Sequence, residues 1–291
     1  MRKSLVALSV LAATALPAVV SAADYSDDIH KNDYNWMQFN LMYAVNELPG
    51  ESDHDYLEME FGGRSGIFDL YGYVDVFNLT NSKSSDKNGE PKIFMKFAPR
   101  ISLDAVTGKD LSFGPVQELY IATVFEYGGD AGYTGVLTNG DGTAQLDSDG
   151  KPQYGAAKGP NNAKVGLGSD VMVPWFGKVG LNLYGFYDMN EKDWNGYQIS
   201  TNWFKPFHFF DNGSFISYQG YIDYQFGMNN DVPGLTSSNG GAMFNGLYWH
   251  SDQFAVGYGL KGYKEIYGLK DGGFAGKTTG IAHYFDVTYK F

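Results

Sequence analysis

The chain ends in Ile281-Ala282-His283-Tyr284-Phe285-Asp286-Val287-Thr288-Tyr289-Lys290-Phe291, and this stretch decides the fold. Counted back from Phe291, nearly every second residue is apolar or aromatic, whereas the residues between them are polar or small. Successive side chains of a β-strand point to opposite faces, so the pattern predicts a strand with one apolar and one polar face. Eleven residues are about the length that crosses a bilayer at a tilt. The stretch therefore favours a membrane-spanning β-barrel, with a soluble β-sandwich as the alternative.

Residues 1–22 have the three parts of a secretory signal peptide. A basic start at 2–3 is followed by an apolar run over 5–20 and by small residues up to Ala22. We therefore expect cleavage after Ala22, which leaves 23–291 as one mature domain. No later stretch approaches 18 consecutive apolar residues, so no membrane-spanning helix is predicted. An exported chain of this kind can enter a membrane only as a closed barrel, in which every backbone group pairs with a neighbouring strand.

Composition supports the barrel. Aromatic residues make up 16% of the chain and 38 residues are glycine, yet the mean hydropathy is only -0.29. A barrel places aromatic side chains in girdles at the membrane surfaces and polar ones in its lumen, so hydropathy cancels along each strand. The chain has no cysteine, which excludes disulfides and thiolate metal sites. Its formal charge of -12 argues against nucleic acid as a partner, because no basic stripe is available to neutralise phosphates.

Alternating segments recur along the mature chain and predict an all-β fold, a transmembrane antiparallel β-barrel of about twelve strands. In the segment 68–77, for example, Phe68 and Leu70 alternate with Asp69 and Tyr71. The expected strands are 36–45, 56–64, 68–77, 92–100, 116–127, 163–171, 179–187, 196–204, 214–226, 241–249, 254–263 and 281–291. Their even number is what single-chain bacterial barrels require.

The connections between these segments alternate in length. The longer set is 47–55, 78–91, 128–162, 188–195, 227–240 and 264–280, and the shorter set is 65–67, 101–115, 172–178, 205–213 and 250–253. Outer-membrane barrels have short periplasmic turns and longer extracellular loops, so the longer set is expected outside the cell. The connection 128–162 is rich in Gly, Asp, Asn and Thr, which predicts mobile, solvated backbone and not a second domain. The connection 101–115 is long for its set and predicts a structured turn.

Five motifs resemble the nucleoside-specific channel-forming (Tsx) family. They are Phe68-Asp69-Leu70-Tyr71-Gly72-Tyr73-Val74-Asp75, Ala98-Pro99-Arg100-Ile101-Ser102-Leu103-Asp104, Asp110-Leu111-Ser112-Phe113-Gly114-Pro115, Val165-Gly166-Leu167-Gly168-Ser169-Asp170 and Trp194-Asn195-Gly196-Tyr197. The resemblance implies a monomeric twelve-stranded barrel in the Gram-negative outer membrane that passes nucleosides by passive diffusion. It also implies that the outer loops serve as a bacteriophage or colicin receptor. Lys96 and Ala98 depart from the family pattern, in which acidic residues are expected, and this bears on the substrate.

Two further partners follow from the membrane location. The outer face is expected to contact outer-membrane lipid. A terminal aromatic residue such as Phe291 is typical of outer-membrane barrels and is expected to contact the barrel-assembly machinery. Twelve tilted strands enclose a narrower tube than the sixteen of general porins, which favours a selective channel.

The inward register collects aromatic and ionisable side chains. A nucleoside has a flat base, which can stack on an aromatic ring for about 1–3 kcal/mol, and ribose hydroxyls that can bond to charged groups. Tyr71 and Tyr73 lie between Asp69 and Asp75 on one strand face, which predicts a base-stacking track with carboxylates that hold the sugar. The other residues expected to line the lumen are Glu58, Glu60, Arg64, Phe94, Arg100, Glu118, Tyr120, Tyr184, Phe186 and Asp223. Alternatively, these charges pair with one another and rigidify the lumen.

Catalysis and metal binding find little support. Glu58 and Glu60 could suggest acid–base chemistry, but none of the five histidines is expected in a cluster with them. Asp147-Ser148-Asp149-Gly150 lacks the ligand spacing and closing Glu of a calcium loop. We therefore predict no enzyme, cofactor or metal. Two hypotheses remain beside the nucleoside channel: a general or differently selective diffusion porin, and a surface receptor or adhesion barrel with little transport.

Overall fold

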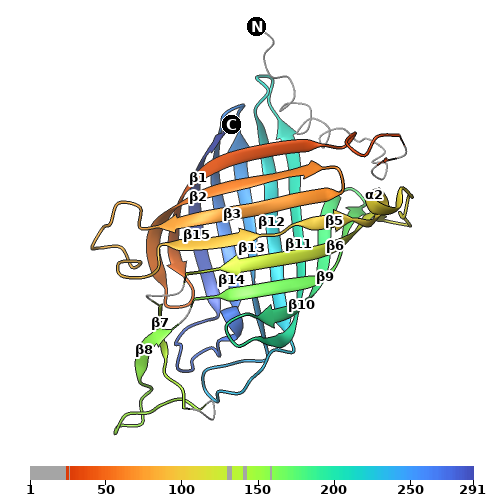
Figure 1. Cartoon of the computed structure of the whole chain (residues 1–291). Coiled ribbons are helices and arrows are strands. Elements are labelled where there is room, and N and C mark those ends of the chain that lie inside the picture. Colours follow the sequence, from red (N-terminus) through yellow and green to blue (C-terminus); the bar gives the residue numbers. More distant parts are fainter. Residues whose placement is uncertain (1–23, 26, 130–132, 140–142, 158) are drawn as a thin grey trace.

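The computed structural model describes residues 24–291 except 26, 130–132, 140–142 and 158. The predicted signal peptide, 1–22, lies outside the described residues. The described chain forms a closed antiparallel β-barrel (Figure 1). Each barrel strand pairs with the next one along the chain, and the last strand pairs with the first, with Phe39 opposite Tyr289 and Leu41 opposite Val287. The ring therefore has no free edge.

Twelve barrel positions are filled, as the alternation predicted. They are β1 (Tyr34–Glu47), β2 (Ser52–Ser65), β3 (Phe68–Phe77), β4 (Ile93–Phe97) continued by β5 (Arg100–Ser102), β6 (Val116–Tyr127), β9 (Asn161–Val173), β10 (Gly177–Asp188), β11 (Asp193–Phe209), β12 (Phe215–Phe226), β13 (Asn239–His250), β14 (Phe254–Lys264) and β15 (Gly280–Lys290). Each of the twelve expected segments overlaps one of these positions. Among the described residues, no helix is long and apolar enough to cross a membrane.

The prediction of one continuous strand over 92–100 is wrong, because the fourth position of the barrel is interrupted at Ala98 and Pro99. Proline has no N–H to donate to a ladder and therefore occurs at strand ends and irregularities. The Pro99 carbonyl instead accepts two hydrogen bonds from Thr123, at 3.1 Å from the backbone nitrogen and 2.8 Å from Oγ1. Both pieces, β4 and β5, still lie between β3 and β6.

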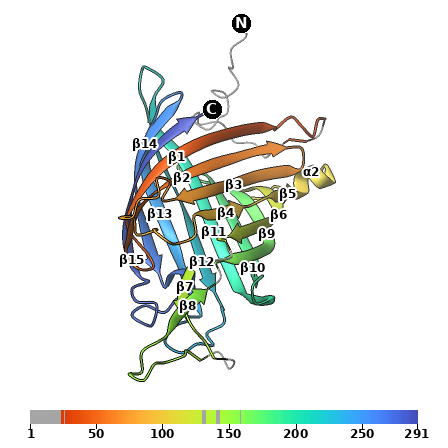
Figure 2. The same cartoon turned by 60° about the vertical axis from the view of Figure 1, so that its left-hand side comes forward.

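The expected structured turn after this strand is confirmed as α2 (Leu103–Thr107). The Ser102 hydroxyl accepts a hydrogen bond from the Ala105 backbone nitrogen at 3.1 Å and so caps the first turn. Gly108 ends the helix in the left-handed region, with φ of 62°, a conformation that costs glycine little. The short turns, α2 and the C-terminus share one end of the barrel, here called the turn end (Figure 2).

The longer connections share the opposite end, here called the loop end, and carry secondary structure. Within 128–162, β7 (Tyr133–Val136) pairs with β8 (Tyr154–Ala157) in a hairpin that projects beyond the barrel (Figures 1 and 2). The prediction of unstructured backbone is therefore wrong for this part of the connection. The short η1 (Ile266–Gly268) lies between β14 and β15. The connections 128–162 and 264–280 contact each other, since the Tyr154 hydroxyl donates to the Phe274 carbonyl at 2.8 Å.

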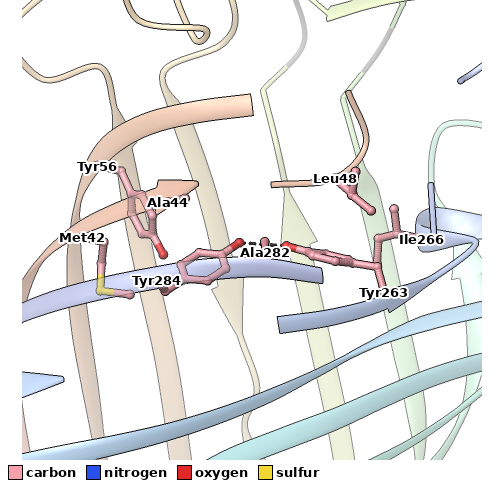
Figure 3. Close-up of a cluster of buried hydrophobic side chains, with 8 residues drawn as sticks. All are labelled: Met42, Ala44, Leu48, Tyr56, Tyr263, Ile266, Ala282 and Tyr284. Atoms are coloured by element: carbon pink, nitrogen blue, oxygen red, sulfur yellow. Dashed lines mark hydrogen bonds between the residues drawn. The ribbon is translucent and has the colours of Figure 1, made fainter. Parts of the chain in front are cut away.

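The two faces of β15 differ as predicted. Phe285 and Val287 are each about half exposed on the outer surface, whereas Asp286 and Thr288 are 5% and 2% exposed on the inner face. Toward the loop end, inward side chains form a compact cluster in which the Tyr263 and Tyr284 hydroxyls bond at 2.8 Å (Figure 3). The barrel thus turns an apolar belt outward and a polar, tyrosine-rich surface inward, which is the distribution that a transmembrane barrel needs.

Candidate functional site: the barrel lumen

The lumen is a cavity of about 3380 Å³ lined by inward side chains from all twelve positions of the barrel. Twelve of the fourteen residues predicted to line it do so: Glu58, Glu60, Arg64, Asp69, Tyr71, Tyr73, Asp75, Phe94, Arg100, Tyr184, Phe186 and Asp223. Glu118 and Tyr120 are not part of the lining. They point inward but are covered, with 3% and 0% of their surface exposed. The strand register was therefore correct for both, and only their depth was wrong.

An arginine network fills the lumen wall toward the turn end. Arg64 pairs with Glu118 at 2.9 Å and with Asp69 at 3.3 Å. Arg100 pairs with Asp69 at 2.9 Å and with Asp170 at 3.0 Å. These five residues are the arginine network. Both oxygens of Asp69 are occupied by guanidinium groups, so this carboxylate is held in place and not offered to a solute. Here the structure matches the hypothesis of charges that rigidify the barrel.

Two tyrosines complete the network. The Tyr120 ring lies under the Arg100 guanidinium at 3.9 Å, a cation–π arrangement. The Tyr25 hydroxyl donates to Glu118 at 2.6 Å and accepts from Arg64 at 2.8 Å. Burial, followed by the hydrogen bond to Glu118, raises the pKa of the Tyr25 phenol, which therefore stays neutral. Tyr25 was missed from the sequence because it precedes the first strand and belongs to no alternating register.

Four rings form an aromatic track along one wall, consisting of Trp36, Tyr71, Tyr73 and Phe94. The ring centroids are 6.4 Å apart from Trp36 to Tyr71, 6.2 Å from Tyr71 to Tyr73 and 6.0 Å from Tyr73 to Phe94. The Tyr71 hydroxyl donates to Glu60 at 2.8 Å, which fixes the ring's direction. The structure thus brings together the tyrosines that the sequence placed on one face and extends them on both sides.

A second aromatic row was missed from the sequence. Tyr221 of β12 stacks on Phe244 of β13 at 6.0 Å and 16°, and Phe244 contacts Tyr284 at 5.9 Å. Tyr221 lines the same cavity as Tyr71 and Tyr73. The signal for Tyr221 was present, because it lies two residues before Asp223 and shares its inward register.

Glycines in β14 make room for inward rings of β13. A Cβ at Gly259 would lie 2.2 Å from the Phe244 ring, and one at Gly257 would lie 2.1 Å from the Tyr248 ring. Real Cβ atoms do not approach rings so closely, so a larger residue at either position would force the ring to move. The rings can therefore lie flat against the wall, and the lumen stays open.

Lys96 and Lys164, which line the lumen, are also paired with carboxylates. Lys96 bonds Asp223 at 3.1 Å and lies 3.9 Å from Glu126, which in turn bonds Lys164 at 2.7 Å. The positive charge at Lys96, one of two departures from the family pattern, is therefore compensated locally. Ala98, the other departure, packs against a small cluster that includes Tyr184. Among the described residues, no group of carboxylates and histidines is arranged to hold a metal ion.

A closed barrel with an apolar outer belt and an open, charged and tyrosine-lined lumen is a porin-like channel of the bacterial outer membrane. The chain belongs to the Tsx family: residues 31–291 match the family described as "Nucleoside-specific channel-forming protein, Tsx". The resemblance in the sequence motifs is thereby confirmed, together with the outer-membrane location. The protein is accordingly a channel and not an enzyme.

Two relatives found by sequence comparison agree with this assignment. Outer membrane protein OmpK of Vibrio parahaemolyticus is 70% identical, and the match covers 100% of both chains. Nucleoside-specific channel-forming protein Tsx of Salmonella typhimurium is 29% identical, also over 100% of both chains. Among solved structures, the KdgM porin matches 87% of this chain and 99% of its own at 10% identity, with a TM-score of 0.42.

Proposed function

We propose that the barrel is a channel for the passive, substrate-selective diffusion of nucleosides. The aromatic track is the observation that carries the proposal. Its rings succeed one another every 6.0–6.4 Å along the lumen wall, so a planar base can leave one ring as it meets the next. Stacking contributes about 1–3 kcal/mol per base and tolerates any base, because every base has a π-face. Family membership supports the same substrate class.

Carboxylates beside the track are suited to the sugar. Glu60 and Asp75 line the lumen next to Tyr71 and Tyr73 and belong to no ion pair among the described residues. Carboxylate oxygens accept hydrogen bonds from hydroxyls, and they do so most strongly where the group is ionised. The sequence suggested Asp69 for this role as well. We do not assign it to the sugar, because both of its oxygens pair with arginines of the network. Binding must stay weak, since a channel that holds its solute tightly cannot release it.

The two other hypotheses have less support. A general diffusion porin has no need of a continuous row of rings. A receptor barrel with little transport would have its lumen filled by interlocked pairs, and the arginine network does this only toward the turn end, while a cavity of about 3380 Å³ remains. Because one chain closes the ring by itself, we propose that the channel works as a monomer. We also propose that Phe291, which is 65% exposed, is presented to the assembly machinery.

Loss of one ring from the track should weaken nucleoside binding. In planar bilayers, uridine should reduce the current through the wild-type channel in a saturable manner. Tyr71→Ala and Tyr73→Ala should each weaken this block by about 1–3 kcal/mol, with little change in open conductance or folding. Tyr154→Ala, in an outer loop, is the matched control and should leave the block unchanged. Unchanged block in both track variants, or altered conductance and stability with unchanged block, would assign the rings a structural role only.

We propose further that the loop end faces the cell exterior and that its long connection, 128–162, is recognised by bacteriophage. The projecting β7–β8 hairpin exposes about half of the Leu146 and Tyr154 side chains. Protease added to intact cells should therefore cut within 128–162 before it cuts the short β2–β3 turn, and phage adsorption should fall in step. Cleavage of 128–162 only after lysis would reverse the orientation of the barrel.

A further inference from the structure

Four carboxylates on one side of the lumen have no cationic partner. They are Glu58, Glu60, Asp75 and Asp286, here called the acidic patch, and they line the cavity from β2, β3 and β15, with β1 lying between β15 and β2. Glu58 lies directly opposite Asp75 in the β2–β3 register. No ion pair among the described residues includes a member of the patch. By contrast, the lumen carboxylates of Asp170, Glu126 and Asp223 are each paired with a cationic side chain.

The patch has more hydrogen-bond acceptors than donors. Its donors are all neutral: Gln38 to Glu60 at 2.6 Å, Asn40 to Glu58 at 2.6 Å, Tyr71 to Glu60 at 2.8 Å and Thr288 to Asp286 at 3.0 Å. Three oxygens remain without a donor, the Oδ1 atoms of Asn40, Asp75 and Asp286. Their side chains belong to residues that are only 4%, 8% and 5% exposed. Unsatisfied buried polar atoms are rare in proteins and need a partner, which here must supply donors.

The protein's own cations do not supply that partner. Lys261 lines the same cavity, but its amino group lies 3.9 Å from Glu47 and over the rings of Tyr263 and Tyr284. Lys96, which faces the same lumen, is bound to Asp223. Glu58 lies opposite Asp75 in the β2–β3 register, and two carboxylates that share a site hold one proton between them, which removes one negative charge. The remaining charge of the patch is still uncompensated, and a neutral nucleoside would leave it so.

The surroundings of the patch favour an organic cation. Tyr56 lies two residues before Glu58 on the inward register of β2, and Tyr248 of β13 lines the same cavity as the patch. Aromatic rings attract ammonium groups through their faces, and an ammonium group carries three donors and no acceptor. A compact metal ion fits less well, since the described residues form no metal-binding cluster.

We propose that the acidic patch binds organic ammonium ions and that the channel admits such cations in addition to nucleosides. Glu58 and Glu60 are two residues apart on one strand, about 6–7 Å, a separation that a short diamine can bridge. This inference needs only an open lumen and goes beyond the proposed nucleoside transport.

The test is block of single-channel current by 1,4-diaminobutane. We expect saturable block of the wild-type channel and none by 1,4-butanediol, which has the same length but no charge. Glu58→Gln and Asp286→Asn should each weaken the block roughly tenfold, the value of one charge-assisted hydrogen bond. Glu191→Gln makes the same chemical change in a connection at the loop end and should have no effect. Open conductance checks that each variant has folded.

The possible outcomes separate this inference from the proposed function. Absence of diamine block in a channel that uridine still blocks would overturn the ammonium site alone. Equal block by the diamine and the diol, or diamine block unchanged in both patch variants, would also overturn it. Diamine block that depends on the patch would support the site, even in a channel on which uridine had no effect. Asp286→Asn should leave uridine block intact, because this residue lies outside the aromatic track.

Discussion

Replacement of Arg100 by methionine should destabilise the barrel by about 3–5 kcal/mol, the usual cost of removing one partner from a buried charge network. The Arg100 guanidinium pairs with Asp69 at 2.9 Å and with Asp170 at 3.0 Å, and stacks on Tyr120. Methionine fills similar volume but leaves the buried Asp69 and Asp170 carboxylates with fewer partners. Urea-dependent folding into lipid vesicles measures the loss of free energy of unfolding.

The control for this prediction is an exposed ion pair. Lys277 and Glu51 lie 2.6 Å apart, but about half of each side chain is exposed at the loop end. Lys277→Met should therefore change stability by no more than about 1 kcal/mol, because water screens such pairs. Equal effects of Arg100→Met and Lys277→Met would show that the arginine network contributes no more to the free energy of unfolding than an exposed ion pair does.

Arginine at position 287 should destabilise the membrane-inserted barrel by about 2–4 kcal/mol, the cost of a cation facing lipid near the midplane. Val287 is 51% exposed on the outer belt and pairs across the closure with Leu41, near the middle of β1. Folding yield and free energy of unfolding in lipid vesicles provide the measurement. The same change in detergent should be milder, because detergent rearranges around a charge more easily than a bilayer does.

Thr288→Arg is the matched control, one residue further along the same strand. Thr288 faces the lumen beside Asp286, so an arginine there would gain a carboxylate partner and should be tolerated. Since neighbouring strand residues face opposite sides, the two variants separate lipid from lumen. Similar destabilisation by both would contradict the register of the closing strand.

The sequence predicted the twelve-stranded barrel because period-two alternation records directly which face each residue occupies. The prediction failed where contacts with residues distant in the sequence determine the local structure. Pro99 interrupts the fourth strand although the residues around it alternate. Its carbonyl accepts hydrogen bonds from Thr123 and takes no part in a regular β-ladder. The β7–β8 hairpin was not predicted, because it lies in a polar connection whose composition is typical of solvated loops.

The lumen was predicted less completely than the fold. Register gives the side on which a residue lies but not its partner, so Asp69 looked available although Arg64 and Arg100 occupy it. Register also does not say how deeply a side chain is buried. For that reason the covered position of Tyr120 was not predicted. Tyr221 could have been found from its spacing to Asp223, whereas no periodic signal marks Tyr25.

Selective flux is the central claim, and proteoliposomes test it most directly. Uridine and glucose would be supplied together at low concentration to vesicles that contain the purified protein. A general pore passes the smaller glucose molecule faster. The aromatic track instead predicts faster entry of uridine, with saturation as its concentration rises and inhibition by adenosine. Faster entry of glucose, with no saturation for uridine, would contradict the account.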